Sequence, residues 1–161
     1  WQQAFDEAQD VLLPAPISVD GGGTIATGTM VDSHMIFFNT EDDIRVDDFL
    51  VDWTFDGMIL GVMSDQDGTL EEASNPFLAA PGTTYPSSPY YELRGLEIGF
   101  GDTYTVSGNM ITVSMRISEP GDWMRVVTAT PNPIPEPATM LLFGTGLAGL
   151  AGLGRRKLKK Q

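Results

Sequence analysis

Apolar and polar side chains alternate along several short segments of this chain, which is the pattern of half-buried β-strands. In residues 51–55, one Val and two aromatic side chains alternate with Asp and Thr. In residues 110–118, apolar side chains occupy every second position from Ile111 to Ile117. The run Met35–Phe38 is apolar on both faces, so it predicts a central strand.

Turn signals rich in Gly and Pro separate these segments. Asp56-Gly57 predicts a two-residue hairpin, Gly108-Asn109 a tight turn, and Pro120-Gly121 the centre of a type II turn. The predicted strands are 24–30, 33–39, 51–55, 58–63, 102–107, 110–118 and 123–128, with the first two joined at Val31-Asp32.

Residues 73–91 contain four prolines among Ser, Thr, Gly and aromatic residues, and we expect them to be one long irregular segment. We expect no helix before residue 138. Many short strands with Gly/Pro turns indicate an all-β fold, an antiparallel β-sandwich of the jelly-roll or immunoglobulin-like kind, for residues 1–130.

The pattern changes completely after residue 130. Residues 131–137 alternate proline with other residues, which predicts a stiff, extended linker. Residues 138–154 are uncharged and apolar all round, and as a helix they would span roughly 25 Å, slightly less than a bilayer's hydrocarbon core. Residues 155–161 carry five Lys and Arg, which mark the cytoplasmic side of a membrane span.

We therefore divide the chain into four parts, listed here in order: an acidic exported β-sandwich domain (1–130), a Pro-rich linker (131–137), a single C-terminal transmembrane helix (138–154) and a basic cytoplasmic tail (155–161). Since this orientation requires export, we expect a signal sequence to precede Trp1 in the full precursor.

Charge and cysteine content narrow the classes of function. All 22 Asp and Glu lie in residues 1–136, where only four Arg and no Lys oppose them. Such an acidic domain repels nucleic acid and anionic lipid, so we expect no nucleic-acid partner. The chain has no cysteine, which excludes disulfides, Cys-ligated zinc and a thiol nucleophile.

Asp65, Asp67 and Glu71 are the best candidates for a metal site, and calcium is the only cofactor that the sequence suggests. Aligned on Gly68, they fall at positions 3, 5 and 9 of an EF-hand loop. The two anchoring positions at the ends of such a loop hold Met and Ser, which supply no carboxylate. A solvated acidic turn is the favoured alternative, because Asp and Gly are ordinary turn residues.

Other candidate chemistry has a structural alternative that we favour. His34 with Asp32 could ligate a metal, but a histidine on a strand is more often packed and hydrogen-bonded. Carboxylate pairs for glycan hydrolysis, Asp52/Asp56 or Glu71/Glu72, are not singled out by any spacing. The remaining candidates are aromatic: Phe77, Tyr85, Tyr90 and Tyr91 as a sugar-stacking platform or as pins for their loop, and Trp53 and Trp123 as core residues.

The tail resembles a known sorting signal. Ile134-Pro-Glu-Pro-Ala-Thr-Met-Leu-Leu-Phe-Gly, a Gly/Leu-rich span and a terminal Arg-Arg-Lys are similar to the PEP-CTERM signal of bacterial envelope proteins. The resemblance implies processing by exosortase, an integral-membrane cysteine protease-like enzyme. Residue by residue, Pro135, Glu136 and Pro137 would be the recognition motif, and Arg155, Arg156 and Lys157 the basic stop.

The resemblance also implies a location and a setting. The protein would sit transiently in the inner membrane with its N-terminal domain in the periplasm, and then at the cell surface or outside the cell. Proteins with this signal typically accompany exopolysaccharide and biofilm formation. We expect a non-enzymatic surface or matrix protein; the alternatives are a calcium- or carbohydrate-binding module and, less favoured, a glycan hydrolase.

Overall fold

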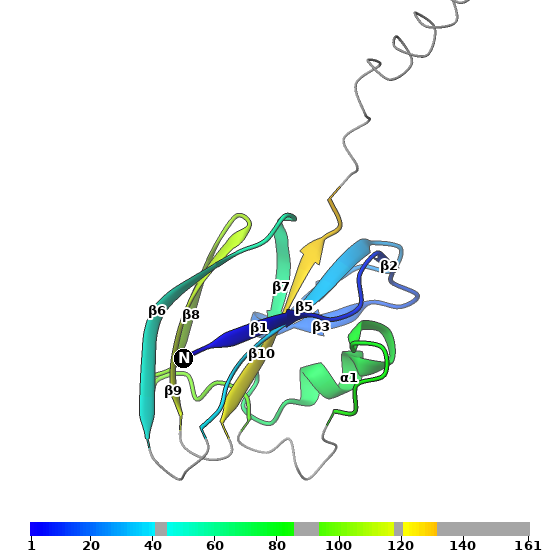
Figure 1. The fold of residues 1–161 in the computed structure, drawn as a ribbon. Coiled ribbons are helices and arrows are strands. Elements are labelled where there is room, and N and C mark those ends of the chain that lie inside the picture. Colours follow the sequence, from blue (N-terminus) through cyan, green and yellow to red (C-terminus); the bar gives the residue numbers. More distant parts are fainter. Residues whose placement is uncertain (41–44, 86–93, 118–120, 132–161) are drawn as a thin grey trace, which may run out of the picture. The chain divides into compact units, whose positions relative to one another are not determined.

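The computed structural model describes residues 1–40, 45–85, 94–117 and 121–131 (Figure 1). The chain divides into two units, Trp1–Pro131 and Asn132–Gln161, and every described residue belongs to the first. The predicted linker from residue 132, the span 138–154, the basic tail and the sorting motif lie outside the described residues. Within the described residues, no helix combines the length and the apolar character that crossing a membrane requires.

The first sheet is built around two long strands. Its order is β1 (Gln3–Asp6), β5 (Met30–Phe38), β10 (Asp122–Ala129) and β7 (Ile59–Met63), and β2 (Val11–Leu12) also pairs with β5. All of these pairings are antiparallel. β5 and β10 each have a neighbour on both sides, so they are the central strands of this sheet.

The second sheet has the order β6 (Val46–Thr54), β9 (Met110–Ile117) and β8 (Thr103–Ser107), again antiparallel. A separate two-stranded sheet joins β3 (Ile17–Val19) to β4 (Gly23–Ile25) through a 3₁₀ turn at Asp20–Gly22. The α-helix α1 spans Thr69–Leu78.

The two larger sheets face each other across one shared hydrophobic core. Its buried side chains come from both sheets and one loop: Ile36, Phe38, Val62, Leu96, Ile111, Val113, Met115, Ile117, Met124 and Val126. Alternate residues of β9 from Ile111 to Ile117 are all buried, as their spacing predicts. The antiparallel β architecture expected from the sequence is confirmed.

The other face of the first sheet is also covered, by α1 and the β3–β4 pair (Figure 1). The core on that side contains Leu13, Ile17, Val19, Ile25, Val31, Met63, Leu78 and Val127. A central strand with cover on both faces needs apolar side chains in both directions, which explains the run Met35–Phe38. The prediction of a central strand there is confirmed.

Two predicted connections were wrong. Val31 and Asp32 lie inside β5, so the predicted turn between two strands does not exist. Asp56-Gly57 does not close a hairpin, because β6 pairs with β9 while β7 pairs with β10, and the turn instead links the two sheets. Gly57 is needed there because a Cβ atom would collide with the carbonyl oxygen of Ala129.

The helix α1 was also missed, since residues 73–78 of the predicted irregular segment are helical. The helix was not predicted because Pro76 and the weak helix formers Ser74 and Asn75 disfavour helix in this segment. Tertiary contacts outweigh these propensities: Leu78 is fully buried in the core, and Asp65 accepts hydrogen bonds at the start of the helix.

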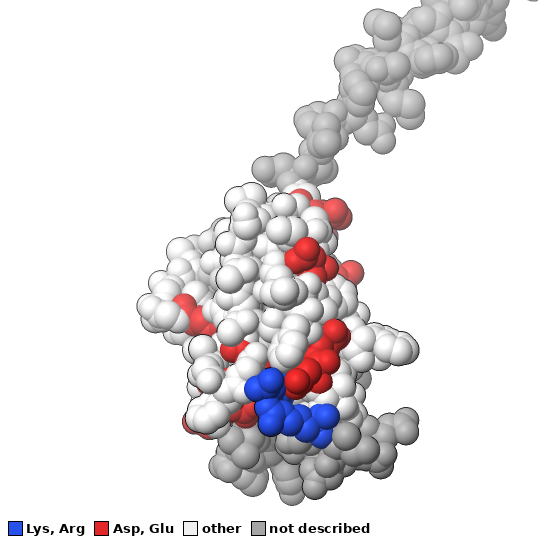
Figure 2. All heavy atoms as spheres, turned by 90° about the vertical axis from the view of Figure 1, so that its left-hand side faces the viewer, with Lys and Arg blue, Asp and Glu red and all other residues white. Residues whose placement is uncertain are grey.

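Figure 2 shows the side of the molecule that carries β6, where acidic side chains are scattered and the basic ones gather at one end. On the second sheet, Asp47 lies 2.9 Å from the Arg116 guanidinium and 3.9 Å from that of Arg45. Asp47 and its neighbour Asp48 belong to β6.

Candidate functional site

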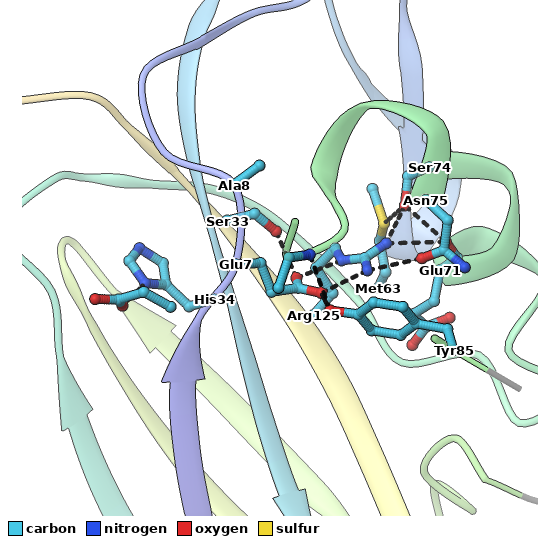
Figure 3. Close-up of polar contacts among 12 residues, drawn as sticks. Glu7, Ala8, Ser33, His34, Met63, Glu71, Ser74, Asn75, Tyr85 and Arg125 are labelled. Carbon is cyan, nitrogen blue, oxygen red and sulfur yellow. Dashed lines mark hydrogen bonds and ion pairs between the residues drawn. The ribbon is translucent and has the colours of Figure 1, made fainter. Parts of the chain in front are cut away.

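A buried arginine lies where the first sheet meets α1 (Figure 3). Arg125 and its partner Glu7 both have fully buried side chains, joined by an ion pair of 2.6 Å. We call this group the Arg125 cluster; its members are Glu7, Ser33, Ser74, Asn75, Tyr85 and Arg125.

Every N–H of the Arg125 guanidinium has an acceptor. Nε and Nη2 donate to the two carboxylate oxygens of Glu7 at 2.6 and 2.7 Å. Nη1 donates to Ser74 Oγ at 2.6 Å and to the backbone oxygen of Glu71 at 2.9 Å, and Nη2 also donates to Asn75 Oδ1 at 2.9 Å. A buried bidentate pair with all donors used has the geometry that offsets the cost of burying charge.

The Glu7 carboxylate is satisfied as completely as its partner. It accepts hydrogen bonds from the hydroxyls of Ser33 and Tyr85, both at 2.6 Å. Burial, together with the hydrogen bond to Glu7, raises the pKa of Tyr85 to about 12, so the phenol stays protonated. The cluster therefore fastens β5, β10, α1 and the segment containing Tyr85 together.

Tyr85 is held within the fold rather than presented as part of a sugar-stacking platform. Its hydroxyl is held by Glu7 and also accepts the Ala80 N–H, and its ring lies 5.7 Å from the Arg125 guanidinium. Phe77 packs against the core beside α1. These contacts agree with aromatic residues that pin their loop; Tyr90 and Tyr91 lie outside the described residues.

The three predicted calcium ligands do not form one group of carboxylates, although Asp65 lies near Glu71. Asp65 caps α1, where its carboxylate accepts the N–H groups of Thr69 and Leu70, and hydrogen bonding to the helix start lowers its pKa against the opposing effect of burial. Asp67 is exposed. Glu71 is 1% exposed, and the structure does not bring the three carboxylates together around a common point.

Glu71 is an unusual buried acid. Neither of its carboxylate oxygens has a hydrogen-bond partner among the described residues. Burial raises its pKa well above the usual value, and the nearby Asp65 carboxylate adds to this increase. Burial therefore favours the neutral, protonated form of this side chain over the ionised form.

His34 is packed and hydrogen-bonded, as expected. Its Nδ1 is 2.7 Å from Asp6 Oδ1, its Nε2 is 3.2 Å from Thr128 Oγ1, and its ring lies against Phe55. Asp32 accepts hydrogen bonds from a backbone N–H and a threonine hydroxyl, at 2.7 and 2.9 Å. Asp6, His34 and Thr128 follow the order acid, imidazole, hydroxyl of a nucleophile relay, and His34 and Thr128 line a cavity of about 210 Å³. Thr128 itself is only 1% exposed, on a central strand.

The other sequence candidates have structural or surface positions. Asp52 accepts the Thr112 hydroxyl on an exposed face, and Glu72 is exposed on α1 beside the buried Glu71. Trp53 and Trp123 are half-buried rather than core residues. Trp53 nevertheless packs against the shared core and donates its indole N–H to Gln2 at 3.2 Å.

A cavity of about 250 Å³ opens beside the ends of β1, β5 and β10. Its apolar wall includes Phe5, Phe37 and Trp123, while Asn39 and Arg94 add polar groups. The Arg94 guanidinium lies 5.2 Å from the Trp123 ring centroid. Aromatic walls with a few polar groups suit a small neutral ligand.

The structure assembles one group of carboxylates that the sequence did not single out. Glu97, Asp102 and Asp122, which we call the carboxylate triad, each place one oxygen within 4.8 Å of the others. Asp102 and Asp122 are 1% and 5% exposed, and Glu97 is half-buried. Asp122 lies at the start of β10, whereas the other two lie in the segment that leads into β8.

This proximity could not be read from the sequence, because Asp122 is twenty positions from Asp102 and the two residues lie at strands of different sheets. The only available signal was an acidic residue immediately after the Pro120-Gly121 turn. Among 22 acidic residues that signal is too common to select one of them.

Comparison with known proteins identifies the tail. Its proline motif, apolar run and basic end are the parts of a C-terminal signal that directs an exported protein. The family model of the PEP-CTERM protein-sorting motif matches residues 133–157, which contain Pro135, Glu136 and Pro137. No curated protein and no solved structure matches the chain. The motif implies an exported protein that exosortase sorts to the cell surface or the extracellular space.

Proposed function

We propose that this protein is a non-enzymatic component of the cell surface or extracellular matrix, delivered by exosortase and associated with exopolysaccharide. The sorting motif at residues 133–157 is the observation that carries the proposal. In this scheme residues 138–154 anchor the chain transiently in the inner membrane, with the β-domain in the periplasm. Exosortase then cuts near Pro135–Pro137.

The environment of the β-domain's charged groups supports a non-enzymatic role. Its buried ion pair is fully hydrogen-bonded within the fold, and its histidine is held between Asp6 and Thr128. A general acid or base has to reach a substrate atom, and these groups are already committed to protein partners.

Sorting is tested by the intact mass and the location of the protein in native cells with and without exosortase. We expect a shortened, released or surface-attached protein in the first strain and a full-length, membrane-associated protein in the second. Glu136→Ala should behave like the strain without exosortase. Pro131→Ala, just outside the matched residues, is the control and should be processed normally. Equal mass and location in both strains would reject the proposal.

Carbohydrate binding is the second candidate, and the cavity beside Trp123 favours it. Aromatic faces such as Phe5 and Phe37 offer apolar surfaces for sugar rings, and Asn39 offers hydrogen bonds. Calorimetry with purified matrix polysaccharide should show heat that Phe37→Ser abolishes. The control Phe49→Ser changes an exposed aromatic residue on the other sheet and should bind normally. No heat for the unmodified protein would remove this candidate.

A further inference from the structure

The carboxylate triad concentrates negative charge at a buried point. Burial and the charges of Asp102 and Glu97 raise the pKa of Asp122 to about 8, and burial and Asp102 raise the pKa of Glu97. Like charges held this close repel one another unless a proton or a cation is shared between them.

Asp102 is fixed in place by the backbone. Its Oδ1 accepts the Arg116 N–H at 2.6 Å, and its Oδ2 accepts the Glu97 N–H at 2.9 Å. These bonds connect β9 to the segment before β8 and orient the carboxylate. Each carboxylate oxygen has a second lone pair that these bonds leave available.

Asp122 supplies an independent indication of a missing ligand. Its side chain is 95% buried, and its Oδ2 has no hydrogen-bond partner among the described residues. Its carboxylate also points into the triad, within 4.8 Å of the other two. A buried carboxylate oxygen without a partner costs free energy, and a bound cation would remove that cost.

We propose that Glu97, Asp102 and Asp122 bind a calcium ion. Carboxylate oxygens are hard ligands, whereas zinc sites are usually built from histidine and cysteine side chains. Calcium binds oxygens at 2.3–2.6 Å, so two ligands on opposite sides of the ion are about 5 Å apart, and the triad's limit of 4.8 Å accommodates this. Magnesium demands near-ideal octahedral geometry and usually keeps several waters, so a largely buried group of three carboxylates suits calcium better.

The ion would connect the two sheets at one end. Asp122 begins a central strand of the first sheet, while Asp102 precedes the edge strand β8 of the second. Calcium would complete its shell of six to eight ligands with water or backbone carbonyl oxygens. Binding would therefore stabilise the contact between the sheets, and the inference does not depend on where the protein is sent.

The test is the thermal unfolding of the full chain in a mild nonionic detergent, after metal has been removed with a chelator and the chelator dialysed away. We expect calcium chloride well above the dissociation constant to raise Tm by about 5–10 °C. Asp122→Asn should fold and should lose this rise. Glu97→Gln should weaken calcium binding at least tenfold, measured by calorimetry.

Asp67→Asn is the matched control, because it removes a carboxylate from the loop that the sequence favoured and that is exposed in the structure. It should keep the full response to calcium. Terbium gives a direct readout, since Trp123 adjoins Asp122 and can sensitise luminescence from an ion at the triad. Calcium should displace that signal, and Asp122→Asn should not show it.

Three results would overturn the proposal. No change in Tm and no heat with calcium at millimolar concentration would remove the site. A response that persists in Asp122→Asn but disappears in Asp67→Asn would move it to the other loop. An equal response to magnesium would overturn the assignment of calcium.

Discussion

The Arg125 cluster and the carboxylate triad both bury charge on β10, where Arg125 follows Asp122 by three positions. Residues three apart on a strand point to opposite faces, so the two groups lie on opposite sides of the first sheet. In the cluster a cation is buried with an anion, and five N–H groups find acceptors. In the triad two buried acids and one half-buried acid lie together, and one oxygen has no partner among the described residues.

This difference shows how the same strand can bury charge for two purposes. The Arg125 cluster is complete within the chain, since Glu7 and α1 supply every acceptor that the guanidinium needs. The triad is complete only with a proton or a cation from outside. Substitutions in the cluster should therefore destabilise the protein, whereas substitutions in the triad should stabilise it when no cation is bound.

The largest effect is expected at the Arg125 cluster. Glu7→Gln leaves the guanidinium buried without its counter-ion, and we expect a loss of about 3–5 kcal/mol in the free energy of unfolding. Urea unfolding of the full chain, followed by tryptophan fluorescence, measures the change.

Arg45→Gln is the control, because Arg45 is 61% exposed and pairs with Asp47 at 3.9 Å. It should change the stability by less than about 0.5 kcal/mol. Replacing both buried partners, as in Glu7→Leu with Arg125→Met, should cost less than Glu7→Gln alone, because no charge stays unpaired. A double variant that is less stable than Glu7→Gln would contradict this account.

The next effect concerns Glu71, whose side chain is buried beside the cluster without a hydrogen bond to it. Since burial raises its pKa in the folded protein, the folded state binds the proton more tightly than the unfolded state. The stabilisation from this proton is complete below the unfolded pKa of about 4.3 and declines as the pH rises towards the folded pKa, by up to about 1.4 kcal/mol per pH unit. Glu71→Gln should therefore gain stability relative to the unmodified protein between pH 4 and pH 7.

Glu72→Gln is the matched control on the same helix, because Glu72 is exposed. Its difference from the unmodified protein should stay constant over this pH range. Urea unfolding at pH 4, 5, 6 and 7 gives both profiles. If Glu71→Gln ran parallel to the unmodified protein, Glu71 would be ionised in the folded state.

The smallest effect is expected at the triad in the absence of calcium. Asp122→Asn replaces an acid whose ionisation is opposed by burial and by its two neighbouring carboxylates, and it adds an N–H donor, so we expect a gain of about 1 kcal/mol in a calcium chelator. Added calcium should reverse the order, because only the unmodified protein then gains stability. A variant less stable than the unmodified protein under chelation would mean that Asp122 makes a stabilising contact with the rest of the chain.

The parts of the fold that depend on neighbours in sequence could be predicted. The β8–β9 hairpin follows from its alternating pattern and from Gly108, which has φ = +68° in the turn. The central position of Met35–Phe38 follows from its apolar run. The tail motif could also be recognised in the sequence, because its elements follow one another within 25 residues and a family model matches them.

The parts that depend on distant contacts could not be predicted. The helix α1 is stabilised by the burial of Leu78 and by contacts with Arg125, which outweigh the poor propensity of its sequence. The ion pair of Glu7 with Arg125 joins residues 118 positions apart. An acidic residue at position 7 carries no local sign that a guanidinium will be buried against it.

The position of β10 has a mechanical consequence. The segment that leads to the sorting motif emerges from a strand hydrogen-bonded along both edges, to β5 and to β7. A pull along that segment, with the rest of the domain held fixed, would load both ladders in shear, so that many bonds share the force and must rupture together. A surface protein fastened through this end would resist drag far better than one whose final strand could be peeled from an edge one bond at a time.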